Sequence, residues 1–176
     1  MNTEMQPFWN KVQDLYPIRI DGRQVSYEMF KDEMGRFLDQ IKAGGRSFSH
    51  FGLVVDNIDN AMSELSEHTG TELTLVKKTW MDLNNVHVGR LNISELELVA
   101  PDGDGMYLDA LKTNGRHFHH ISYTADSLEA INQCLENIKD TAEIIDENPH
   151  KGGILAFIKL KKSASIWIEY GFTKVH

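Results

Sequence analysis

The sequence predicts an α+β fold in which two βαβββ modules follow an N-terminal helical extension. The main observation is an internal repeat: the segment FSHFGLVVD at 48–56 returns as FHHISYTAD at 118–126. A second pair of strand-like segments follows, ELEL at 95–98 and IWIE at 166–169. In both halves the first segment leads into an acidic turn and an amphipathic helical pattern. Two modules with the same order of elements account for this repetition.

Residues 1–46 form the expected extension, and the domain proper is expected to span 47–176. A first apolar cluster comprises Phe8, Trp9, Val12, Leu15 and Tyr16. Ser26 stands where it would cap a second helix, and Gly44 stands where that helix would end. The apolar stripe of this helix has the spacing of period 3.6 and comprises Tyr27, Phe30, Met34, Phe37, Leu38 and Ile41. Such a stripe needs a partner, so we expect it to pack on the modules or across a homodimer interface, with a lid over a site as the alternative.

The first module is expected at about 48–101 and the second at about 117–171. In the first module we expect a strand, a helix and three strands at 48–55, 59–68, 72–78, 85–91 and 95–99. A short helix is expected between the modules at 106–113. The helix of the second module opens with a capping-box pattern at Asp126. The last three strands are expected at 142–146, 154–160 and 165–170.

Composition limits the classes of function. The chain has 176 residues, of which 41% are hydrophobic and 25% charged, as in an ordinary globular protein. A formal net charge of −8 argues against a nucleic-acid or anionic-membrane partner. No apolar run approaches the ~20 residues that span a bilayer, and no secretory-signal pattern is visible. Cys134 is the only cysteine, which excludes an internal disulfide, so we expect a cytoplasmic protein.

Four polar residues stand at matched places in the two modules: His50 and His120 in the first strands, and Glu97 and Glu169 in the last strands. Strand side chains alternate between faces, and the residue two positions after each histidine is small, which leaves room for a ligand. Each of the four alone is more often structural. Carboxylates that face the interior of a sheet, however, need a charge partner. Imidazole and carboxylate suit first-row metals, so we predict one divalent ion (Zn, Co, Ni, Mn or Fe) bound by these four residues.

These residues in these places resemble the vicinal oxygen chelate superfamily, which includes glyoxalase I, methylmalonyl-CoA epimerase, extradiol dioxygenases and bleomycin-resistance proteins. The resemblance covers about 48–171 and implies paired βαβββ modules that form a cupped mixed sheet around one metal site. It carries the family's ligands over to His50, Glu97, His120 and Glu169. Extradiol enzymes use two histidines and one glutamate, so a fourth ligand at Glu97 points to the glyoxalase–epimerase branch. Bleomycin-binding members lack the metal set.

Within that branch the sequence is more similar to the methylmalonyl-CoA epimerases. The similar stretches are LELVAP at 96–101, HHI at 119–121 and DENPHKGG at 146–153. The glyoxalase I signature DPDG before the last ligand is absent, and KKSA at 161–164 stands in its place. Epimerases have a second carboxylate base on the third strand of the first module, and His87 occupies that place here. The N-terminal extension has no counterpart in the family pattern.

The resemblance implies a metal-dependent isomerase or lyase that stabilises an enolate, with epimerase-like chemistry on a small molecule such as an acyl-CoA thioester. Epimerisation needs two bases, one on each face of the planar enolate. Glu169 would be one base and His87 the other, because imidazole transfers protons near neutral pH. The alternative for His87 is a half-buried strand histidine held by a hydrogen bond. The alternative functions are a glyoxalase-like lyase, a thiol transferase acting on a small electrophile, and a metal-free protein that binds a drug-like small molecule.

Overall fold

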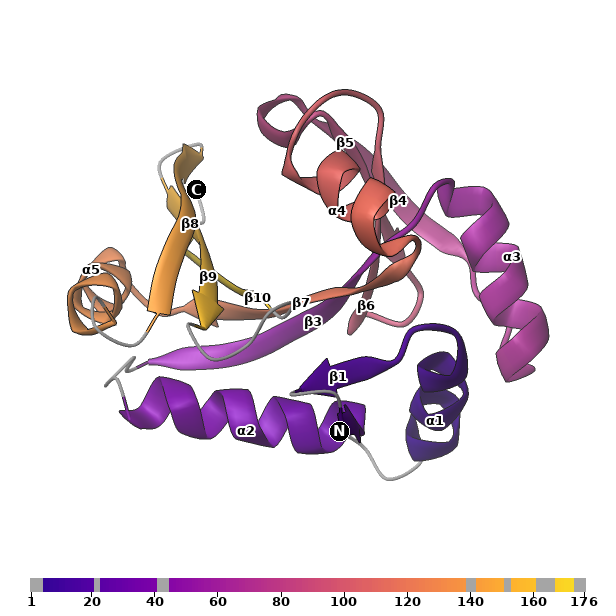
Figure 1. The fold of residues 1–176 in the computed structure, drawn as a ribbon, viewed down its shortest axis with the longest axis horizontal. Helices are drawn as coiled ribbons and strands as arrows, with labels where there is room; N and C mark the ends of the chain where they lie inside the picture. The colour runs from indigo at the N-terminus through magenta and orange to yellow at the C-terminus, as the bar shows by residue number, and fades with distance from the viewer. Residues whose placement is uncertain are drawn as a thin grey trace. The chain divides into compact units, whose positions relative to one another are not determined.

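The structure is a computed structural model that describes residues 5–20, 23–40, 45–138, 142–150, 153–160 and 167–172. Over these residues the chain has the expected α+β fold with two βαβββ modules (Figure 1). Within the described ranges, no helix is both long enough and apolar enough to cross a membrane. The sequence-based expectations for Ile41, Gly44, 151–152 and 161–166 fall outside the described residues.

The chain forms two compact units, and each contains one module together with part of the N-terminal segment. The first unit comprises Met1–Ile18 and His50–His119, and the second comprises Arg19–Ser49 and His120–His176. The N-terminal segment is therefore divided between the units. Its two short strands, β1 (Ile18–Ile20) and β2 (Arg23–Val25), pair with each other.

The first module contains five main elements: β3 (Arg46–Val54), α3 (Ile58–Thr69), β4 (Leu75–Met81), β5 (Val86–Leu91) and β6 (Leu96–Pro101). Their strand order is β4-β5-β6-β3, in which β3 and β6 are parallel and the other neighbours are antiparallel. The first and last strands of the module are thus adjacent. The side chain of Asn57 caps α3 by accepting a hydrogen bond from the Asn60 backbone N–H at 2.9 Å. Gly70 ends the helix in the left-handed conformation, with φ of 70°.

One face of this module is covered by α3. A Cβ atom at Gly89 of β5 would lie 2.9 Å from Cγ2 of Ile58 in α3, so the strand and the helix approach too closely for a larger side chain. Gly89 is in register with Leu98 of β6. Arg90 and Glu97 are the next pair in the register, so their side chains lie on the opposite face. That second face carries the polar residues of the module.

The second module repeats this order with β7 (His117–Ala125), α5 (Leu128–Asn137), β8 (Ala142–His150), β9 (Gly153–Leu160) and β10 (Trp167–Phe172). Its residues from His120 onward belong to the second unit. The strand order is β7-β10-β9-β8, and β7 and β10 are again parallel neighbours. Ser127 caps α5 by accepting a hydrogen bond from the Ala130 backbone N–H at 3.1 Å. The capping side chain is therefore Ser127 and not Asp126. The helix between the modules is α4 (Met106–Asn114).

The helix α1 (Gln6–Leu15) belongs to the first unit. The Trp9 ring lies edge-on to Phe51 of β3, with centroids 5.1 Å apart. Lys11 Nζ donates a hydrogen bond to the Thr69 carbonyl at the end of α3 at 2.9 Å. The apolar cluster of this helix is buried at Phe8, Trp9, Val12 and Tyr16. This part of the extension therefore contributes to the core of the first unit.

The helix α2 (Tyr27–Gln40) belongs to the second unit. Ser26 Oγ accepts a hydrogen bond from the Met29 backbone N–H at 3.1 Å, as the capping pattern predicted. The Tyr123 hydroxyl of β7 donates to the Lys31 carbonyl at 3.0 Å, which joins this helix to the second module. The buried residues of its stripe are Tyr27, Phe30, Met34 and Leu38.

The largest displacement of an expected element is that of β4, which was expected at 72–78 and lies at Leu75–Met81. The backbone N–H of Thr74 donates to Oδ1 of Asn92 at 2.9 Å, and the Asn92 N–H donates to the Thr74 carbonyl at 3.0 Å. These bonds close the end of the hairpin, so pairing with β5 begins at Leu75, and a register shift follows between Leu75 and Lys77.

Candidate metal centre

The first-module pair consists of His50 on β3 and Glu97 on β6. Glu97 is in parallel register with Gly52, so it shares a face with Gly52 and with His50 two residues earlier. The Nε2 atom of His50 lies 3.3 Å from Oε1 of Glu97. The two residues are 1% and 4% exposed, so both polar groups are removed from solvent. Burial of a carboxylate at this level requires charge compensation.

Arg90 supplies positive charge to this pair from the neighbouring strand β5. Its Nε atom lies 2.5 Å from Oε2 of Glu97, and its NH1 group lies 3.3 Å from Nδ1 of His50. The Arg90 side chain is 46% exposed, whereas both of its partners are buried. Sequence reasoning did not assign Arg90 to this site. Only the antiparallel register, which places Arg90 opposite Glu97, reveals the contact.

The second-module pair consists of His120 on β7 and Glu169 on β10. Their Nε2 and Oε2 atoms are 3.6 Å apart. Ser122 is in register with Glu169, and its hydroxyl donates to Oε1 of the carboxylate at 2.7 Å. The Phe157 ring lies edge-on to the His120 ring at 5.8 Å and closes one side of it. His120 is fully buried, and the Glu169 side chain is 14% exposed.

The two pairs are built by equivalent positions of the two modules. In each, the histidine comes from the first strand, the glutamate from the last strand, and the two strands are parallel neighbours. His50, Glu97 and His120 are buried donors of the kinds that hold a divalent ion. The donor set of imidazole and carboxylate fits a first-row metal in both modules. The structure thus places each histidine beside the carboxylate predicted from the same module.

His87 lies on the other face of β5 from Arg90. It is in register with Ala100, and it is three residues from Arg90, so it is on the face of β5 opposite the one that carries Glu97. Its Nε2 atom lies 3.3 Å from Oδ2 of Asp102, and its side chain is 36% exposed. The Trp80 ring packs on it with centroids 4.9 Å apart. These contacts suit a half-buried, hydrogen-bonded strand histidine, and His87 does not share the face of Glu97. Its role as a base stays a prediction.

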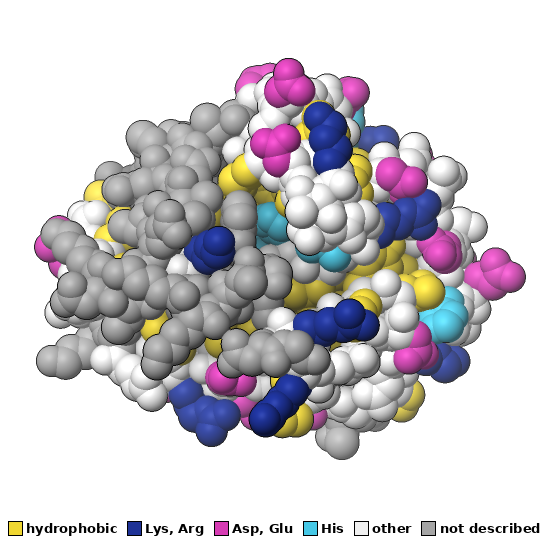
Figure 2. Space-filling view, in the orientation of Figure 1, with side chains coloured by type: hydrophobic (Ala, Val, Ile, Leu, Met, Phe, Trp, Pro, Cys, Tyr) yellow, Lys and Arg dark blue, Asp and Glu magenta, His cyan; other side chains and the backbone are white. Residues whose placement is uncertain are grey.

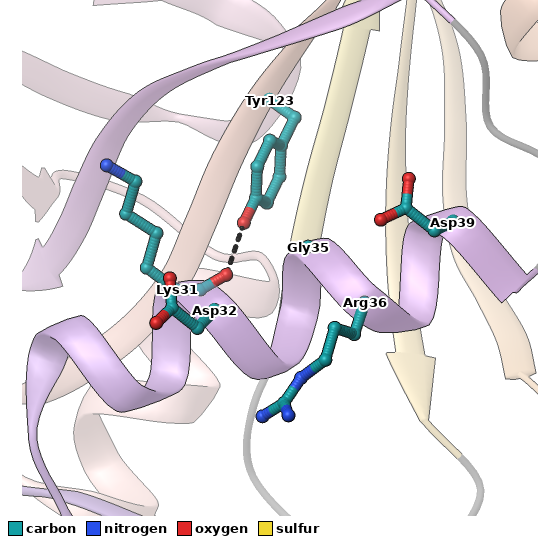
Figure 3. Close-up of a pocket in the computed structure, with 6 residues that line it drawn as sticks. All are labelled: Lys31, Asp32, Gly35, Arg36, Asp39 and Tyr123. Carbon is teal, nitrogen blue, oxygen red and sulfur yellow. Dashed lines mark hydrogen bonds between the residues drawn. The ribbon is translucent and has the colours of Figure 1, made fainter.

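A separate cavity of about 430 Å³ lies in the second unit beside α2. Figure 3 shows its lining residues on α2 and on β7: Lys31, Asp32, Gly35, Arg36, Asp39 and Tyr123. Burial raises the pKa of the Tyr123 hydroxyl, which therefore stays protonated and donates to the Lys31 carbonyl. None of the predicted site residues lines this cavity.

Surface charge is mixed on the face of the molecule shown in Figure 2. Lys and Arg side chains are scattered among acidic and uncharged ones over the described part of that face. The formal net charge of the whole chain is −8. This face therefore shows no continuous basic surface among the described residues.

The chain belongs to the glyoxalase/bleomycin resistance protein/dioxygenase superfamily, whose family model matches residues 49–156. The match begins next to His50 and includes Glu97 and His120. Glu169 lies beyond the matched segment. No curated protein sequence matches the chain.

Solved structures share the fold at low sequence identity. A hypothetical protein, BH1468, from Bacillus halodurans C-125 has a TM-score of 0.62 and 20% identity, with 74% of this chain and 96% of that chain covered. A variant of the Streptomyces coelicolor methylmalonyl-CoA epimerase in complex with 2-nitronate-propionyl-CoA has a TM-score of 0.61 and 17% identity, with coverage of 73% and 95%. The Mycobacterium tuberculosis methylmalonyl-CoA epimerase has a TM-score of 0.55 and 20% identity, with coverage of 73% and 88%. These likenesses confirm the fold expected from the resemblance.

Proposed function

We propose that His50, Glu97, His120 and Glu169 bind one divalent metal ion, and that the protein is a metal-dependent isomerase or lyase that stabilises an enolate. One observation carries the proposal: each module has a histidine beside a carboxylate at the same two strand positions. Arg90 already compensates the charge of Glu97, so the support for a metal ion is the matched placement of imidazole and carboxylate donors in the two modules. Membership of the superfamily supports the proposal.

A bound divalent ion would supply Lewis-acid stabilisation to the negative charge that develops on a substrate oxygen. Glu169 is the residue to which we assign proton transfer. Its Oε1 atom is held by the Ser122 hydroxyl, which fixes the orientation of the carboxylate. In this role the Glu169 carboxylate removes a proton from the carbon next to a carbonyl and holds that proton until it is returned. The nearby Phe157 ring limits the access of water to His120.

Acyl-CoA thioesters are the first substrate class that we propose. The support is the likeness to epimerase structures, one of which contains 2-nitronate-propionyl-CoA. A thioester carbonyl makes the proton on the neighbouring carbon more acidic. A carboxylate base together with an electrophile at the carbonyl oxygen promotes removal of that proton.

The place of His87 favours a second candidate, a glyoxalase-like lyase. Epimerisation needs a base on each side of a planar enolate, and His87 is on the opposite face of β5 from the residue that contacts Glu97. A reaction with one base removes and returns the proton on the same side. Glu169 alone is sufficient for such a reaction.

The metal assignment is tested by elemental analysis of protein purified without chelator and by titration of the metal-free protein with zinc. We expect one ion per chain and a zinc affinity at least roughly tenfold lower in His120→Ala, the scale reported even for residues around metal ligands. His68→Ala is the matched control, because His68 lies on the surface of α3 beside Asp14. Undiminished stoichiometric metal in a protein lacking both His50 and His120 would overturn the assignment.

The reaction class is tested by solvent deuterium exchange into acyl-CoA thioesters and into adducts of 2-oxo-aldehydes. We expect Glu169→Gln to slow exchange by roughly 10²- to 10⁴-fold, the contribution of a general base. His87→Ala should leave turnover within a few-fold of the wild type if one base is sufficient. If His87→Ala stops racemisation of a thioester while exchange into one stereoisomer persists, the two-base epimerase is correct and the lyase candidate fails.

A further inference from the structure

Arg90 determines which nitrogen of His50 carries the proton. The arginine guanidinium has five N–H donors and no acceptor. Its NH1 group lies 3.3 Å from Nδ1 of His50, so that nitrogen must accept the hydrogen bond. In a neutral imidazole the proton is then on Nε2, which faces Oε1 of Glu97 at 3.3 Å. The contact with Arg90 thus fits the Nε2–H tautomer of a neutral His50.

A metal ion requires the other tautomer. The nitrogen that binds a metal offers its lone pair, and the second ring nitrogen then carries the proton and donates it to an acceptor. If Nε2 of His50 binds the ion beside Glu97, Nδ1 becomes an N–H donor that faces the N–H donor of Arg90. Two donors cannot satisfy each other, and a cation beside a divalent ion adds repulsion. Ion binding and the Arg90–His50 contact thus exclude each other.

We infer that Arg90 is a resident counter-cation of the first-module pair, which compensates Glu97 in the metal-free protein and must leave Nδ1 of His50 when a metal ion binds. This inference rests on the proposed function, since it concerns the same ion. The Arg90 side chain can move away from His50 into solvent, because 46% of it is already exposed while Glu97 is buried. Arg90 is therefore a positioning residue that lowers metal affinity and compensates the buried charge of Glu97 when no ion is bound.

The register of the second module places a different residue beside its carboxylate. Arg90 is in antiparallel register with Glu97, and Phe157 holds the matching register position opposite Glu169. There the carboxylate is held by the Ser122 hydroxyl, which can remain in place when a cation arrives. The corresponding residue in the first module is Gly52, which offers no hydroxyl. Arg90 thus holds the Glu97 carboxylate as Ser122 holds the Glu169 carboxylate. Unlike the serine hydroxyl, the arginine carries a positive charge that competes with the metal ion.

The wild-type protein tests the inference directly. Long-range ¹H–¹⁵N spectra distinguish the two tautomers of a neutral histidine. We expect His50 to be the Nε2–H tautomer in the metal-free protein and the Nδ1–H tautomer after one equivalent of zinc. An Nδ1–H tautomer in the metal-free protein would overturn the inference, because Nδ1 would then not accept from Arg90.

Substitution supplies a second test, read out as zinc affinity by competition with a chelator. Arg90→Gln removes the charge and supplies an amide oxygen that can accept from Nδ1–H. We expect roughly tenfold or greater tightening of zinc binding, in line with the effect of residues that orient metal ligands. Lys78→Gln is the matched control: it removes one positive charge from the same unit, at a side chain that is 42% exposed and forms a 4.0 Å ion pair with Asp59. The control should leave zinc affinity within about twofold.

The outcomes separate the inference from the proposed function. Equal zinc affinity in wild type and Arg90→Gln, or tightening by Lys78→Gln of the same size, overturns the inference while the metal site stands. Weaker zinc binding in Arg90→Gln also overturns it, because Arg90 would then support the ligands. Absence of zinc binding in both proteins overturns the proposed function and the inference with it. Should Arg90→Gln fail to fold, the tautomer measurement on the wild type decides.

Discussion

Trp9 gives the sharpest test of how the N-terminal segment is integrated into the first unit. The side chain is 1% exposed and lies edge-on to Phe8 at 5.2 Å and to Phe51 of β3 at 5.1 Å. We consider the substitution Trp9→Ala, which removes the indole and leaves a cavity between α1 and β3. If α1 were an appendage, this change would have little effect on unfolding.

The expected loss can be worked out from burial. A tryptophan buries roughly 200 Å², which at about 25 cal/mol per Å² corresponds to about 5 kcal/mol, and alanine recovers a small part of it. Measured substitutions of buried aromatic residues by alanine fall at about 3–5 kcal/mol. We therefore expect a loss of about 4 kcal/mol in the free energy of unfolding, or a fall of about 8–16 °C in melting temperature.

The measurement is urea unfolding followed by far-ultraviolet circular dichroism, which does not depend on the removed fluorophore. Trp80→Ala is the matched control, because Trp80 is 40% exposed on β4 and the chemical change is the same. We expect the control to lose no more than about 1 kcal/mol, as exposed substitutions usually do. Equal losses in the two variants, or a loss below about 1 kcal/mol for Trp9→Ala, would refute the packing of α1 as part of the core.

Two further predictions concern the N-terminal segment and the single thiol. A chain that starts at Gly45 lacks both α1 and α2, so we expect it to aggregate or melt at lower temperature in light scattering and calorimetry; unchanged solubility and melting would show that the segment is dispensable. Burial raises the pKa of the Cys134 thiol to about 11, which keeps it protonated at pH 8. We expect no reaction with a thiol reagent at pH 8 in the native protein and complete reaction in urea, and rapid native labelling would contradict the buried position.

The sequence was sufficient for the parts of the fold that depend on repetition and periodicity. Ser26 was recognised as a helix cap because capping has a short-range signature, and the hydrogen bond from the Met29 N–H to Ser26 agrees with it. His50 and Glu97 were placed together because both repeats carry the same residue types at the same strand positions. These patterns are local or occur twice because of the repeat, so they can be recognised without knowledge of the tertiary structure.

What the sequence could not supply is strand register. A shift of one residue moves every side chain of a strand to the other face. Arg90 and His87 are both on β5, and only the observed pairing with β6 shows that Arg90 shares the face of Glu97 while His87 does not. The bounds of β4 were missed for a related reason: the two hydrogen bonds that end the hairpin join Thr74 to Asn92, 18 positions further along the chain.

The adjacency of the first and last strands in each module has a consequence for unfolding. His50 and Glu97 are 47 positions apart (97 − 50), and His120 and Glu169 are 49 apart (169 − 120). An ion bound by both members of a pair would close the intervening chain into a loop, as a covalent cross-link does. For a loop of this length, cross-linking removes about 4 kcal/mol of chain entropy from the unfolded state. Metal binding to these residues would therefore stabilise each module against unfolding. A chelator would remove this stabilisation and make the segment between the paired residues more accessible to proteases.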